Sequence, residues 1–86
     1  MATRQVVIDI PEKILLAEKT DEIRFSRELR MLAAVKLYEL GRLSSGIAAE
    51  LAGMSRVEFL LNLIRYRVFP FVFELTDLEA HAGPPT

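Results

Sequence analysis

The sequence predicts a mostly α-helical fold, a small helical domain with a helix-turn-helix-like unit and short β-strands near both ends. Apolar residues recur at helical spacing over about residues 21–40. Two shorter helical patterns, at about 45–52 and 55–66, are separated by a glycine at position 53. The 86 residues fit one domain, which we expect to span 1–82, with 83–86 as a disordered tail.

The N-terminal region is expected to contain a strand and a short helix. Over residues 4–10, Val6, Ile8 and Ile10 alternate with the residues between them, as in a half-buried strand. Pro11 ends this strand and is suited to the first turn of a helix over about 11–18. Thr20 or Asp21 can then cap the next helix.

The helix expected at about 21–40 has two apolar stripes. The longer one contains Phe25, Leu29, Leu32, Ala33, Leu37 and Leu40 together with Lys36. The second contains Met31, Val35 and Tyr38. Because a small core needs only one face, and 51% of the residues are hydrophobic, we expect a homo-oligomer, most simply a dimer. Its interface is expected to comprise Met31, Val35, Tyr38, Val57, Leu60, Leu61 and Ile64.

The region from Leu43 to Arg67 has the pattern of two helices joined by a tight turn. Gly41 ends the preceding helix, and Ser44 or Ser45 can cap the first helix of the pair. Gly53 supplies the positive φ of the turn. Ser55, followed three residues later by Glu58, forms the pattern of a capping box. This arrangement is typical of a helix-turn-helix.

Residues 68–75 alternate like a strand, and Pro70 confines that strand to a sheet edge. The aromatic side chains Phe69, Phe71 and Phe73 suggest a surface that docks a partner protein. The alternative is that this strand covers the protein's own core or that of a dimer mate.

The residue content argues against an enzyme. There is no cysteine, and the one histidine, His81, lies beside Gly83 and two prolines. The acidic residues of the N-terminal and C-terminal segments have no convergent third ligand. We therefore expect no catalytic residues, no metal and no cofactor.

Charge and hydropathy indicate location and partners. The start of the chain has no long apolar core of the signal-peptide type, and no apolar run approaches the roughly 20 residues of a membrane helix, so we expect a cytoplasmic protein with no membrane partner. The net charge is −1, but residues 42–67 contain four arginines against two glutamates. A basic middle followed by an acidic, aromatic end suggests two surfaces with two partners.

Three segments together resemble a known family. They are Val35–Ser44, Ala48–Arg56 and Glu58–Leu60, and the likeness also covers the strand-Pro-Glu opening. This pattern is similar to uncharacterised protein family 0175, small prokaryotic predicted antitoxins with a helix-turn-helix. The resemblance implies a type II toxin–antitoxin role, in which the protein binds and neutralises a toxin, a PIN-like ribonuclease, and represses its own operon.

The candidate DNA-binding residues are Ser55, Arg56, Arg65 and Arg67. Arginines at these positions can contact phosphates, and Arg56 begins a helix whose amide groups favour an anion. However, the face that normally reads bases is largely aliphatic, whereas base edges are read by polar donors. The alternative function is an oligomeric protein-interaction module that has lost sequence-specific DNA binding. A further alternative for Thr3, Gln5 and Val7 is a paired ribbon in the major groove, which Asp9 disfavours relative to strand pairing inside a dimer.

Overall fold

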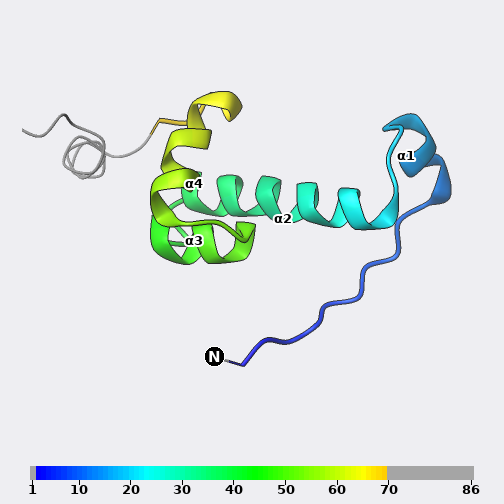
Figure 1. Cartoon of the computed structure of the whole chain (residues 1–86), viewed down its shortest axis with the longest axis horizontal. Coiled ribbons are helices and arrows are strands. Elements are labelled where there is room, and N and C mark those ends of the chain that lie inside the picture. Colours follow the sequence, from blue (N-terminus) through cyan, green and yellow to red (C-terminus); the bar gives the residue numbers. More distant parts are fainter. Residues whose placement is uncertain (1, 70–86) are drawn as a thin grey trace, which may run out of the picture.

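The structure is a computed structural model that describes residues 2–69, and this part of the chain is mainly helical (Figure 1). The elements are α1 (Glu12–Ala17), α2 (Glu22–Glu39), α3 (Ser45–Ala52), α4 (Arg56–Leu63) and a short 3₁₀ turn, η1 (Ile64–Tyr66). The mostly α-helical prediction is confirmed, and the observed helices lie where the sequence predicted them. The helix expected at about 55–66 consists of α4 and η1 together.

Local signals explain where α2 begins and ends. The Asp21 side chain accepts a hydrogen bond from the backbone N–H of Arg24 at 2.9 Å, so Asp21 is the N-cap. After the helix, Gly41 has φ 76°, and its N–H donates to the carbonyl of Tyr38 at 2.9 Å. The next N–H, of Arg42, donates to the carbonyl of Leu37. This pair of bonds satisfies carbonyls that the helix end leaves without partners.

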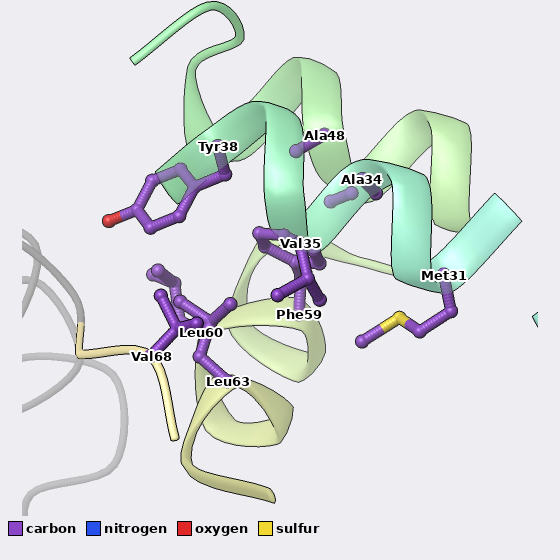
Figure 2. Close-up of a cluster of buried hydrophobic side chains, with 10 residues drawn as sticks. Met31, Ala34, Val35, Tyr38, Ala48, Phe59, Leu60, Leu63 and Val68 are labelled. Atoms are coloured by element: carbon purple, nitrogen blue, oxygen red, sulfur yellow. The ribbon is translucent and has the colours of Figure 1, made fainter. Parts of the chain in front are cut away.

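The buried core lies where α3 and α4 pack on the C-terminal half of α2. Figure 2 shows the side chains of α4 directed towards α2, with Val68 beside them. The rings of Tyr38 and Phe59 meet edge to face, with centroids 5.7 Å apart. Buried alanines on α2 and α3 keep the two helices close. The core residues are Met31, Ala34, Val35, Tyr38, Ala48, Ala49, Phe59, Leu60, Leu63 and Val68.

The assignment of the two stripes of α2 was wrong. Met31, Val35 and Tyr38, expected at an oligomer interface, are buried in the chain's own core. In the longer stripe, by contrast, Leu32 and Leu40 are exposed. The reason is steric, since the face of Met31, Val35 and Tyr38 also includes Ala34, whose small side chain lets α3 approach.

The expected strand at 4–10 is not formed. No backbone hydrogen bond joins these residues to any other part of residues 2–69, and from α1 the segment slopes away from α2 towards the N-terminus (Figure 1). A strand requires a partner strand, and the described part of one chain supplies none. The expected C-terminal strand, at 68–75, begins with Val68 and Phe69, which are not in a strand, and its remainder lies outside the described residues, as does the tail 83–86.

The short helix α1 lies at the N-terminal end of α2, at the far end from α3 and α4 (Figure 1). It contributes no buried residue. Within residues 2–69, no helix combines the length and apolar character needed to cross a membrane.

Candidate functional site

The α3–turn–α4 unit is held at its turn by backbone and side-chain hydrogen bonds. Gly53 has φ 76°, and its N–H donates to the carbonyl of Glu50 at 3.1 Å. The N–H of Met54 donates to the carbonyl of Ala49 at 3.0 Å. Together these bonds form the left-handed helix ending that glycine favours. The predicted turn glycine is therefore confirmed.

The start of α4 contains the predicted capping box. The Ser55 hydroxyl accepts from the backbone N–H of Glu58 at 3.2 Å, and the Glu58 carboxylate accepts from the backbone N–H of Ser55 at 3.5 Å. The Ser55 hydroxyl also donates to the Glu58 carboxylate at 3.0 Å. Ser55, predicted to contact DNA, is exposed but already serves as the N-cap.

Arg30 links α2 to the end of α3, a contact that sequence inspection missed. Its Nε donates to the carbonyl oxygen of Leu51 at 2.8 Å. Leu51 lies in the last turn of α3, where carbonyls lack helical partners and the helix dipole is negative. Arg30 is exposed, yet its guanidinium fixes the end of α3 against α2.

Arg56, the leading candidate for a phosphate contact, joins the two helices of the unit. Its Nε donates to the hydroxyl of Ser45 at 2.9 Å, and Ser45 is buried. The two residues are the first of α4 and the first of α3. Arg56 is half-buried, so its guanidinium holds the N-terminal turns of α3 and α4 together. Sequence inspection did not identify Ser45 as its partner.

The other candidate arginines lie at the C-terminal end of the unit. Arg65 is exposed and its Nη1 donates to the Oδ1 of Asn62 at 3.4 Å. Arg67 is exposed and has φ 58°, the left-handed region that glycine adopts more readily. Arg56 begins α4, whereas Arg65 and Arg67 follow it, so the three arginines occupy both ends of this helix.

The predicted interface residues of α4 divide between two faces of the helix. Leu60 is 0% exposed and belongs to the core with Phe59 and Leu63. Leu61 is 53% and Ile64 63% exposed, while Val57 is half-buried. The prediction for Leu60 was therefore wrong, because this side chain is covered within the chain. Leu61 and Ile64 remain an exposed apolar pair.

Phe69 is exposed just beyond the core residue Val68. Phe71 and Phe73, the other predicted partner-binding residues, lie outside the described residues. We call Leu61, Ile64 and Phe69 the exposed apolar set of the C-terminal region. Among residues 2–69, no group of three or more His, Cys, Asp or Glu side chains is arranged to hold a metal ion.

A separate open cavity of about 600 Å³ lies between the N-terminal segment and α2. One wall consists of Arg4, Val6, Ile8 and Ile10, the alternate residues of the segment. The lining on the helical side includes Leu15, Glu22, Phe25, Ser26, Leu29, Arg30, Ala33 and Leu51. Sequence inspection gave the alternation but no indication that these two apolar faces would lie opposite each other.

Comparisons with known proteins place the chain. The model described as "Uncharacterised protein family (UPF0175)" matches residues 1–82. A UPF0175 protein of Archaeoglobus fulgidus is 41% identical over 58 residues, which cover 67% of this chain and 66% of that protein. A UPF0175 protein of Aeropyrum pernix is 39% identical over 57 residues, or 66% of this chain and 72% of that protein. No solved structure shows a significant match. The chain therefore belongs to the uncharacterised protein family UPF0175.

Proposed function

We propose that this protein is an antitoxin-type regulator of a toxin–antitoxin pair, acting in the cytoplasm. It binds and neutralises a toxin of the PIN-like ribonuclease class and also binds its own operator DNA. The observation that supports this proposal is the α3–turn–α4 unit, a helix-turn-helix in which the Gly53 turn and the Ser55–Glu58 capping box fix the second helix. Such a unit presents its second helix to another macromolecule.

The surface proposed for the toxin is the exposed apolar set, Leu61, Ile64 and Phe69. These apolar side chains are exposed to water in the isolated chain. Covering them with a partner is favourable because it removes apolar surface from water. Each of them follows a buried core residue directly in sequence, namely Leu60, Leu63 and Val68, so a rigid core supports them. A partner that covers this set needs no rearrangement of the core.

The DNA contacts proposed for this unit are to phosphates. Arg65 and Arg67 are exposed and so accessible to a duplex, whereas Arg56 is half-buried against Ser45. Leu61 and Ile64, on the outer face of the unit, have no hydrogen-bond donors for base edges. We therefore expect binding that depends strongly on salt and only weakly on sequence.

The toxin arm is tested by co-expressing the protein with the ribonuclease-like gene product encoded next to it. We expect co-purification and suppression of its ribonuclease activity. Ile64→Asp should weaken both, because it introduces a charge into the apolar set. Ile23→Asp is the matched control, since Ile23 is 67% exposed against 63% for Ile64 and lies on α2. Equal effects of the two substitutions, or no complex at all, would contradict this arm.

The DNA arm is tested by titrating the upstream DNA of the gene at several salt concentrations. Arg65→Ala should weaken binding. It should also reduce the slope of the logarithm of the binding constant against the logarithm of the salt concentration by about one, as expected for one lost phosphate contact. Arg27→Ala on exposed α2 surface is the control. If binding is indifferent to Arg65, the aliphatic outer face of α4 favours the second candidate, an oligomeric protein-interaction module without sequence-specific DNA binding.

A further inference from the structure

The N-terminal segment has the residue pattern of a strand but no partner in its own chain. Residues 4–10 form no backbone hydrogen bond with the rest of residues 2–69. Val6 and Ile8 are strongly exposed, although they alternate as in a half-buried strand. The segment lies over the apolar cavity on α2, and its alternate residues all line that cavity. Its backbone and its apolar face are therefore both uncovered.

We propose that residues 4–10 of a second copy of this chain pair antiparallel with residues 4–10 of the first, and that this two-stranded ribbon closes the cavity over α2. The result is a twofold homodimer. An antiparallel ribbon made from one segment is self-complementary, as a twofold interface requires. This interface differs from the face of α4 proposed to bind a toxin, so it does not depend on that proposal.

The side chains select the register of the ribbon. Directly opposed residues of an antiparallel pair lie on the same face, so the apolar residues of both copies share one face only if even-numbered residues oppose even-numbered ones. Pairing that uses the whole of 4–10 centres the ribbon on Val7. Val6 then lies opposite Ile8 of the other copy, and Gln5 lies opposite Asp9, which accepts a hydrogen bond from the Gln5 amide. No like charges meet.

The charges around the cavity also favour a second copy of the chain as its occupant. The segment runs obliquely to α2 and in the opposite chain direction (Figure 1), and Ile10 and Glu22 flank α1, so both lie at the α1 end of the cavity. In the proposed register the Arg4 side chain of the second copy lies opposite Ile10. That arginine therefore arrives at the end of the cavity that contains Glu22, and each copy supplies the charge that complements the other.

The first experiment measures the mass of the full chain in solution by light scattering and sedimentation. We expect a dimer whose dissociation constant rises by at least about 100-fold in Ile8→Asp, because a carboxylate then enters the closed cavity of each copy. Ile23→Asp is the matched control, since Ile8 is 63% and Ile23 67% exposed and Ile23 does not line the cavity. Far-UV circular dichroism should show unchanged helix content in both variants.

The second experiment tests the register by oxidation of single-cysteine variants, which the absence of natural cysteine permits. Val7→Cys should form a disulfide-linked dimer rapidly, because paired strands bring these Cα atoms within disulfide range. Gln5→Cys is the control, since its two copies would be offset by four residues, or about 13 Å. A monomeric wild type overturns the proposal, including the case in which another segment of the same chain fills the cavity. A dimer unaffected by Ile8→Asp, or equal cross-linking at positions 5 and 7, also overturns it.

Discussion

Gly53 and Gly46 lie in the same α3–turn–α4 unit but differ in what the backbone requires of them. Gly53 has φ 76°, whereas Gly46 lies within α3 without a positive φ. An added Cβ meets nothing closer than an Arg30 nitrogen at 3.9 Å at Gly53, and nothing within 4 Å at Gly46. Space is thus available at both positions. Only the backbone conformation distinguishes them.

We therefore predict opposite effects of the same substitution. Gly53→Ala should lower the free energy of unfolding by about 1–2 kcal/mol, because the left-handed conformation penalises a Cβ. Gly46→Ala should raise it by about 0.5 kcal/mol, because alanine has the higher helix propensity. Urea denaturation of the two variants measures both values. A loss of equal size at both sites would show that packing, rather than φ, determines the outcome.

At the scale of the element, helix ends were predictable because their signals are local. Asp21 and Ser55 each accept a hydrogen bond from the backbone N–H three residues later, and Gly53 ends α3 through bonds to the preceding turn. Each of these signals lies within about five residues of the sequence. The bounds of α2 and α3 and the start of α4 therefore followed from the sequence alone, whereas the change from α4 to η1 after Leu63 did not.

The face that each helix buries was not predictable in the same way. Both stripes of α2 are apolar, and periodicity does not indicate which one α3 and α4 will cover. The choice depends on contacts between residues distant in sequence, such as Tyr38 with Phe59. The prediction of a strand at 4–10 was wrong for a related reason. The alternating pattern describes one strand only, and it does not supply the partner strand that a β-strand needs.

Adjacent leucines of α4 test which face is buried. Leu60 is 0% exposed and Leu61 53%. Leu60→Ala should cost about 2–5 kcal/mol of unfolding free energy through lost burial and a cavity. Leu61→Ala should change it by less than about 0.5 kcal/mol in the isolated protein, because this side chain is largely in water. Chemical denaturation measures both, and comparable losses would contradict the assigned faces.

At the scale of the whole molecule, the part of α2 that packs in the core differs from the part that is open to a partner. The C-terminal half of this helix packs on α3 and α4, while its N-terminal half borders the open cavity. Arg30 lies between the two regions, lining the cavity and donating to the carbonyl of Leu51. The sequence predicted the residue types of the candidate surfaces, but it did not predict the cavity. The cavity forms because residues 4–10 lie opposite α2, and this tertiary arrangement is not specified by sequence periodicity.

This separation predicts a gradient in native-state hydrogen exchange. Amides near Tyr38, Phe59 and Leu63 should exchange only through global unfolding, because their side chains are fully enclosed. Amides of α1, which has no buried residue, should exchange through local opening at a much lower free energy, and those of α2 before Met31 should be intermediate. Mass spectrometry of peptides across α2 measures the gradient, and uniform protection along this helix would contradict it. The cavity that the proposed ribbon closes is lined by α2 residues from Glu22 to Ala33 and by no residue of α4. Raising the protein concentration should therefore increase protection more in that part of α2 than in α4, and the exposed apolar set is left for a different partner.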